Sequence, residues 1–372
     1  MLRNKIINGR RWVVKIGSSL VTNDGHGLER TAIAHWAEQL VSLQQKGLEL
    51  VLVSSGAVAE GVARLSLDAR PKKVHLQQAA AAVGQMGLVQ AYESCFMKHG
   101  VHAAQILLSH EDLSDRTRYL NARSTLSTLL DMNVVPVVNE NDTVATAELC
   151  FGDNDTLAAL VANLINADGM IVLTDQDGLF DADPRLNKRA ELVAHASAYD
   201  ESLVKFAGKG SDLGRGGMTT KISAARLAAR SGTDTVIANG KIDGVLLRLF
   251  AGDLIGTLLT ADCEPVRARK QWLAGQLTLQ GSLTLDAGAV RALRNSGTSL
   301  LAVGVTKVTG KFSRGDVVSC LDQNGIEIGR GLSNYNQDEV QTLSGSSSEK
   351  ILELLGYAGD EEIIHRDNFM IS

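Results

Sequence analysis

Short apolar runs alternate with longer stretches of helical spacing from residue 12 to residue 238, and this alternation restricts the possible folds most. The expected strands cover residues 12–16, 49–53, 101–108, 134–138, 170–173 and 235–238. Small or polar residues follow most of these runs, and stretches with helical spacing lie between them. Repeated in this order, strand and helix build βαβ units, so the sequence predicts an α/β fold with an open, mostly parallel sheet and helices on both faces.

The character of the chain changes after about Gly256. Residues 257–275 contain Pro265 and a basic group around Arg267, which is typical of a connector. From Gln276 onward, short alternating runs are separated by Gly and Asn turns, as in a small β-rich domain. We therefore predict a catalytic domain at 1–262, a linker at 263–275 and a β-rich domain with a C-terminal tail at 276–372, and a length of 372 residues suits two domains.

Composition excludes several classes of protein. Hydrophobic residues at 44% and charged residues at 21% describe an ordinary soluble globular protein, and a net charge of −5 gives no general attraction for nucleic acid or an anionic membrane. The four cysteines are far apart, which argues against a zinc site or a disulfide framework and favours a cytoplasmic location. No apolar run approaches the ~18 residues that span a bilayer.

Polar residues gather where the expected strands end, at 15–19, 54–56, 139–142 and 174–175. In open parallel sheets, ligands bind at the carboxyl ends of the strands. The stretch 139–156 is the richest in carboxylates and side-chain amides, which are costly to fold between a strand and a helix unless they line a ligand site. The alternative is an Asx-rich loop that caps a helix.

Two lysines suggest phosphate chemistry. Lys221 follows a glycine-rich segment that opens a helix, where backbone N–H groups attract an anion, although 214–221 does not match the GxxxxGK[ST] loop and could be a plain flexible loop. Lys15 ends an apolar strand, where it either faces a site or reaches solvent. Together they would form a phosphoryl clamp, with nearby carboxylates orienting the lysines, holding Mg²⁺, or binding a cationic group on the acceptor.

Six segments in order carry a resemblance to a known family: 14–19, 53–57, 138–142, 151–155, 173–175 and 216–221. They resemble the amino acid kinase family, and within it the members that phosphorylate glutamate. The later segment 310–316, Gly-Lys-Phe-Ser-Arg-Gly-Asp, resembles the PUA domain that many bacterial members carry. The resemblance covers nearly the whole chain.

The resemblance implies ATP-dependent phosphorylation of the side-chain carboxylate of L-glutamate to glutamyl 5-phosphate, the first step of proline biosynthesis, with feedback inhibition by proline. Lys15 and Lys221 would neutralise the transferred phosphoryl group, and Asp155 would hold both lysines. The implied substrate-binding residues are Ser55, Asn139, Asp142, Asp153 and Asn154. The implied nucleotide-binding residues are Lys15, Thr174, Asp175, Arg215, Gly216, Gly217, Met218, Thr219, Thr220 and Lys221.

The same resemblance implies that Mg²⁺ arrives with ATP rather than in a metal site of the protein. It also implies a homo-oligomer, either a dimer or a tetramer, and a downstream glutamyl phosphate reductase as a partner. Two residues depart from the family pattern. Cys150 stands where relatives commonly carry a basic residue, which predicts weaker proline inhibition, and Arg215 stands where many have Thr.

Other functions remain open from the sequence. The chain could be an amino acid kinase that acts on a different carboxylate or on a carbamate. An RNA-binding role for the PUA-like domain is less favoured, because residues 276–372 contain 8 Lys and Arg against 12 Asp and Glu. That domain could instead serve regulation or assembly.

Overall fold

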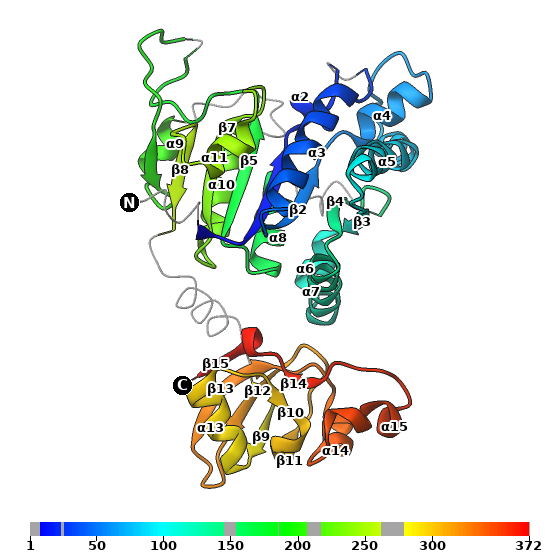
Figure 1. The fold of residues 1–372 in the computed structure, drawn as a ribbon, viewed down its shortest axis with the longest axis vertical. Coiled ribbons are helices and arrows are strands. Elements are labelled where there is room, and N and C mark those ends of the chain that lie inside the picture. The colour runs from blue at the N-terminus through cyan, green and yellow to red at the C-terminus, as the bar shows by residue number, and fades with distance from the viewer. Residues whose placement is uncertain are drawn as a thin grey trace. The chain divides into compact units, whose positions relative to one another are not determined.

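The computed structural model describes residues 8–371, except for gaps at 24–25, 145–153, 185, 207–216 and 262–278. The chain divides into two compact units, drawn in Figure 1. The first unit comprises Met1–Leu113 and Ala122–Arg269, and the second comprises Ser114–Asn121 and Lys270–Ser372. The predicted linker at 263–275 and both of its boundaries lie outside the described residues, so the domain limits stay a prediction.

The first unit is built on a sheet that has eight strands within the described ranges. In spatial order they are β3 (Ala103–Leu108), β4 (Val135–Glu140), β2 (Glu49–Ser54), β1 (Arg11–Ile16), β5 (Gly169–Thr174), β7 (Asp234–Asn239), β8 (Thr257–Thr260) and β6 (His195–Ser197). All neighbours pair in parallel except β7 and β8, which are antiparallel. The predicted open, mostly parallel α/β sheet is confirmed.

The expected helices are also present. The described helical segments between β1 and β8 are α2 (Ser18–Val21), α3 (Arg30–Gln44), α4 (Ala57–Arg64), α5 (Val74–Phe96), η1 (Met97–His99), α6 (His110–Ser114), α7 (Arg116–Asp131), α8 (Asn154–Leu164), α9 (Ser202–Phe206), α10 (Met218–Ala229) and α11 (Val245–Phe250). The range Ser114–Asn121, which includes the start of α7, belongs to the second unit. Helices α3, α5 and α11 contribute to the core on one face of the sheet. Helix α8 packs on β1 and β5, and α10 packs on β7 and α8.

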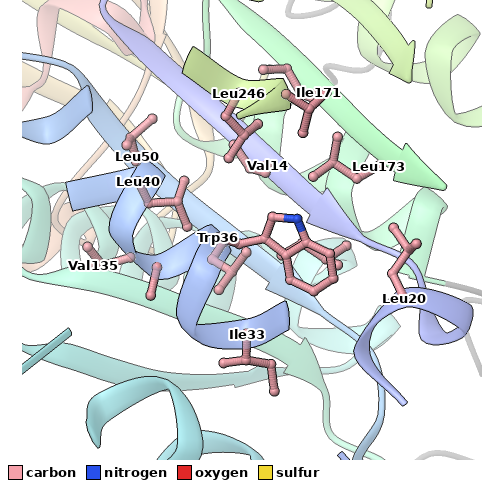
Figure 2. Packing of buried hydrophobic residues seen from close by; sticks show 14 of the residues in the cluster. Val14, Leu20, Ile33, Trp36, Leu40, Leu50, Val135, Ile171, Leu173 and Leu246 are labelled. Atoms are coloured by element: carbon pink, nitrogen blue, oxygen red, sulfur yellow. The ribbon is translucent and has the colours of Figure 1, made fainter. Parts of the chain in front are cut away.

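Alternation along β1 assigns its side chains to the two faces of the sheet. Trp12, Val14 and Ile16 belong to the core with α3. Figure 2 shows Trp36 of α3 directed at the sheet surface that carries Val14 and the β5 residue Leu173. Lys15 therefore lies on the opposite face, where α8 packs. This packing leaves the lysine buried and 4% exposed.

Two sequence-based expectations need correction. Residues 257–260 were expected in the connector, but they form β8, which pairs with both β7 and β6. Asn139 and Glu140 were expected just after a strand, but they are the last residues of β4, since β3 is long enough to pair with them. Both errors concern strand pairing, which depends on a distant partner segment rather than on local composition.

The second unit contains a sheet with five described strands and a small two-stranded ladder. Its strands are β9 (Gly281–Leu285), β10 (Leu300–Leu301), β11 (Val305–Gly310), β12 (Val317–Leu321), β13 (Glu327–Leu332), β14 (Glu362–Ile364) and β15 (Phe369–Ile371). The order is β11-β9-β12-β13-β15 in the larger sheet, and β10 pairs with β14. Its helical segments are α13 (Ala287–Ser296), η2 (Ala302–Gly304), α14 (Gln337–Leu343), η3 (Ser348–Lys350), α15 (Ile351–Leu355) and η4 (Arg366–Asn368). The predicted β-rich C-terminal domain is confirmed.

Across the described ranges, none of the helices is both long enough and apolar enough to cross a membrane.

Candidate active site

Strand β1 lies inside the sheet between β2 and β5. The chain runs from β1 to β2 on one side and returns to β5 on the other side. Such a point of reversal opens a crevice at the carboxyl ends of the strands, because the following loops diverge there. The polar segments after β1, β2, β4 and β5 all meet this edge.

A buried ion-pair group, here called the lysine–carboxylate centre, consists of Lys15, Asp155 and Lys221. Asp155 Oδ1 pairs with the Lys15 ammonium group, and Asp155 Oδ2 lies 3.0 Å from Lys221 Nζ. The exposed fraction is 4% for each lysine and 0% for Asp155. Three elements therefore converge on one carboxylate: β1, the first turn of α8 and the first turn of α10.

The position of Asp155 favours its charged form. Burial alone would raise the pKa of this carboxyl, but the positive charges of Lys15 and Lys221 outweigh burial and hold the pKa below its ordinary value. The N-terminus of α8 adds a favourable potential for a negative charge. Thr220 Oγ1 also lies 3.1 Å from Asp155 Oδ2. Asp155 is thus an ionised group that positions two cations.

The centre carries one net positive charge, since two ammonium groups share one carboxylate. A positive charge held away from water acts strongly on an anion, because few water molecules screen it. In phosphoryl transfer, negative charge is spread over the oxygens of the transferred group. The geometry therefore suits binding and stabilising a phosphoryl group.

Next to this centre lies a chain of hydrogen bonds, here called the amide relay, formed by Gln85, Asn139, Asn154 and Ser55. Asn139 Nδ2 donates to Gln85 Oε1 over 2.8 Å. Asn154 Nδ2 donates to Asn139 Oδ1 over 2.9 Å, to Ser55 Oγ over 3.1 Å and to the carbonyl oxygen of Ser54 over 2.9 Å. The relay joins α5, β4, α8 and the end of β2.

The centre and the relay both border a pocket of about 710 Å³. The predicted site residues on its wall are Lys15, Ser55, Asn139, Asp142 and Asn154. The wall also contains Glu140 from the predicted polar segment 139–142, whereas His26 and the segment 67–70 were not predicted. No motif marks that segment in the sequence, so packing alone brings it to the pocket. The pocket is large enough for a small charged substrate.

The predicted nucleotide residues lie at the same sheet edge. Thr174 is the last residue of β5 and donates a hydrogen bond from Oγ1 to Asp175 Oδ1 over 3.2 Å. Gly217 caps the N-terminus of α10, ahead of Met218 and Thr219. An ideal Cβ at Gly217 would have no described atom within 4 Å, which leaves room for a ligand at this helix start.

Some predicted residues cannot be placed. Asp153, Arg215, Gly216 and Cys150 lie outside the described residues. Thr174 and Asp175 share the sheet edge with Lys15, but within the described ranges their side chains form no hydrogen bond or ion pair with the lysine–carboxylate centre. Likewise, the residues that are described include no group of three or more His, Cys, Asp or Glu side chains suited to hold a metal ion.

A mostly parallel sheet whose carboxyl edge holds two buried lysines on one carboxylate suits a phosphotransferase. Comparison with known proteins agrees with this class. Residues 10–239 match the amino acid kinase family, and residues 281–355 match the PUA domain. The chain belongs to the amino acid kinase family and carries a C-terminal PUA domain.

Particular relatives are similar over the full length. A glutamate 5-kinase of Nitrosospira multiformis is 61% identical over 97% of this chain and 98% of its own. Glutamate 5-kinases of Pseudomonas putida and Pseudomonas syringae pv. syringae are 58% and 59% identical, each over 100% of both chains. The predicted resemblance to glutamate-phosphorylating members of the family is confirmed.

Proposed function

We propose that this protein is an ATP-dependent kinase that phosphorylates the side-chain carboxylate of L-glutamate, giving glutamyl 5-phosphate for proline biosynthesis. The choice of L-glutamate as the substrate rests on full-length similarity to glutamate 5-kinases at 58–61% identity. The lysine–carboxylate centre supports the reaction type, since it places a buried net positive charge beside a pocket for a small substrate.

The proposed mechanism needs no general base. A glutamate side chain is already ionised at neutral pH, so its carboxylate oxygen can attack the γ-phosphorus of ATP directly. The bond between that phosphorus and the β,γ-bridging oxygen breaks, and ADP leaves. Lys15 and Lys221 then balance the negative charge on the transferred oxygens, and Asp155 keeps both ammonium groups in place. Asp155 is a positioning group here, because both of its oxygens are already engaged by lysines.

Mg²⁺ would enter with ATP in this proposal. Bound mainly by phosphate oxygens and water, the ion would neutralise charge on the polyphosphate. The side chains at the site fit a metal ion held mainly by ATP, because both oxygens of Asp155 are paired with lysines rather than left to coordinate Mg²⁺. The nucleotide would bind along Thr174, Asp175 and the start of α10, with Arg215 and Gly216 contributing from outside the described residues.

Substrate binding would fall to Ser55, Asn139, Asp142 and Asn154, together with Asp153. The first four line the pocket, and three of them belong to the amide relay. Neutral amides and a hydroxyl can recognise both the ammonium and the carboxylate groups of an amino acid, since each offers donors and acceptors in fixed directions.

Further parts of the proposal follow from the family resemblance. They are a cytoplasmic location, a homo-oligomer of two or four copies, feedback inhibition by proline that Cys150 weakens, and a reductase that consumes the acyl phosphate. Replacing Cys150 with Lys should alter the affinity for glutamate or proline more than kcat. Unchanged affinities for both ligands would contradict a role for this position.

An ADP-release assay tests the main proposal. We expect turnover with L-glutamate and little or none with N-acetylglutamate or aspartate. Lys221→Ala should lower kcat by at least about 100-fold, because it removes a positive charge from the transferred group. Lys241→Ala, which changes an exposed lysine, is the matched control and should leave kcat unchanged. Full activity in Lys221→Ala would overturn the mechanism.

A further inference from the structure

Gln85 is a buried residue next to the pocket. None of the family motifs contains it, and the proposed mechanism gives it no role. It lies on α5, is 6% exposed, and accepts a hydrogen bond from Asn139 through Oε1. Its Nε2 atom is buried and makes no hydrogen bond with any described residue. A buried donor without a partner is costly, so the amide would gain by turning over unless its neighbours forbid this.

The neighbours do forbid it, and the reason begins at the backbone. The carbonyl oxygen of Ser54 can only accept hydrogen bonds, and it lies 2.9 Å from the amide of Asn154. Asn154 must therefore turn Nδ2 toward Ser54. The same Nδ2 also donates to Asn139, so Asn139 must accept through Oδ1. Asn139 is then left with Nδ2 toward Gln85, and Gln85 must offer Oε1.

The direction of every amide in the relay thus follows from the Ser54 carbonyl oxygen. The Ser54 carbonyl requires a donor at one end, and the Gln85 oxygen accepts the last donor at the other end. The consequence reaches the pocket. With Nδ2 of Asn154 engaged by acceptors, its Oδ1 is the atom left for a ligand, and no described residue donates a hydrogen bond to it. Asn154 lines the pocket.

We propose that Gln85 is a positioning residue that stabilises the amide polarity of the relay by accepting from Asn139, so that Asn154 presents an acceptor, Oδ1, to the α-ammonium group of the substrate. The inference rests on the proposed function, since it concerns how an amino acid substrate is recognised. Ser55 would act as a donor to the substrate. Its Oγ accepts from Asn154, which leaves its hydroxyl proton for a substrate carboxylate.

Helix packing holds Gln85 in register with Asn139. Its neighbour Gly84 lies against α4 so closely that a Cβ there would be 1.9 Å from the Ala57 carbonyl oxygen. On the facing helix, a Cβ at Gly61 would be 1.7 Å from the Ala80 carbonyl oxygen. Two glycines thus let α4 and α5 touch backbone to backbone, and α5 has little freedom to slide. The acceptor at residue 85 is placed by this contact.

Two substitutions of Gln85 separate polarity from packing. Gln85→Met keeps the volume but removes the acceptor, and we expect KM for glutamate to rise about tenfold with kcat changed less than threefold, because a buried Asn139 donor loses its partner. Gln85→Glu keeps an acceptor that cannot act as a donor when ionised, and KM should stay within about threefold of wild type. Gln90→Met, which alters an exposed glutamine on the same helix, is the matched control.

A second measurement does not depend on how well Gln85→Met folds. In Asn139→Asp, the new carboxylate accepts from Asn154, and Gln85 can turn over to donate through Nε2. Adding Gln85→Glu to that variant places two carboxylates together, so KM should rise by more than about tenfold. Gln85→Glu is therefore harmless in the wild type and harmful in Asn139→Asp. Equal effects in both backgrounds would overturn the inference.

Glutarate, which lacks the α-amino group, tests the contact with Asn154. As a competitive inhibitor it should bind Gln85→Met as well as wild type, within about twofold, while glutamate binds more weakly. If Gln85→Met weakens both ligands equally, the residue is structural and the inference fails. If wild type does not phosphorylate glutamate at all, the proposed function fails instead. The two failures are distinguishable.

Discussion

The lysine–carboxylate centre and the amide relay start at adjacent residues of α8, yet they are built from different kinds of interaction. Asp155 heads a charged group with Lys15 and Lys221. Asn154 heads a neutral chain that ends at Gln85. Successive residues of a helix point about 100° apart, so one helix start can serve two networks.

The two networks contribute different properties to the site. The charged centre supplies net charge, which suits a phosphoryl group whose negative charge is spread over several oxygens. The relay supplies direction, because each amide has a donor end and an acceptor end. Charge would bind many anions, whereas fixed donors and acceptors discriminate among small amino acids. The following predictions test whether the two networks are as distinct as the geometry indicates.

The largest effect should come from Asp155→Asn. This change removes the negative charge that both buried ammonium groups share, so we expect the free energy of unfolding to fall by about 3–5 kcal/mol. Urea denaturation would measure it. Asp253→Asn is the control, because its pair with Arg248 is exposed and should contribute only about 0–1 kcal/mol. A loss below that of the control would show that Asp155 does not hold the centre together.

Lys15→Met should act on turnover. Removing the Lys15 ammonium charge that would lie beside the transferred phosphoryl group should lower kcat by about 10²–10³-fold, while KM for glutamate changes less. Steady-state kinetics with saturating ATP would show this, with Lys241→Met as the exposed control. A large rise in KM at constant kcat would mean that Lys15 recognises substrate, and the distinction between the two networks would break down.

Gly84→Ala should disturb the relay rather than the charged centre. Its Cβ would meet backbone atoms of α4 at 1.9 and 2.3 Å, so α5 must shift, and we expect a loss of about 1–3 kcal/mol together with a higher KM for glutamate. In Gly87→Ala the atoms nearest to the Cβ would be at the ends of the Arg64 and Glu60 side chains, at 2.6 Å, rather than backbone atoms, and the effect should be smaller. Equal losses in stability would argue against a rigid contact at Gly84.

The smallest expected effect is the pH dependence of the stability that Asp155 contributes, which changes only in acid. Burial raises the pKa of Asp155, but the lysines lower it more, so the folded-state pKa lies below the ordinary 3.8. The stability from this group is therefore complete well above that value and is lost as the pH falls through the folded-state pKa.

The difference in unfolding free energy between wild type and Asp155→Asn should stay constant from about pH 8 to 5 and shrink below about pH 4. Urea midpoints at several pH values would measure it. A difference that widens with acid would contradict the lowered pKa. The relay has no group that titrates in this range, so the effect of Gln85→Met should not follow pH.

Much of the fold could be predicted because periodic patterns are local. The run at β1 alternates between two buried faces, and its one lysine, Lys15, stands out against apolar neighbours. The short strands β6 and β8 were not predicted, because three or four residues carry too little pattern and their pairing depends on each other and on β7. Residues 257–260 were accordingly assigned to the connector.

The candidate site was foreseen to different extents in its two networks. Lys15, Asp155 and Lys221 were expected together from their residue types, their places at strand ends and helix starts, and the family resemblance. Gln85 was not foreseen, since it sits in a Gln- and Ala-rich helix 54 positions before Asn139. A buried glutamine looks like any other helical glutamine until its neighbours are known.

The order of residues was therefore enough to predict a mostly parallel α/β sheet followed by a β-rich domain, and to propose phosphate chemistry at the edge of that sheet. Only the folded chain showed the contacts of Asp155 with both lysines, which the family resemblance had implied, and the hydrogen bonds that fix the direction of the Asn154 amide. The physical reason is that an ion pair or an amide orientation depends on distances of about 3 Å between segments far apart in the sequence.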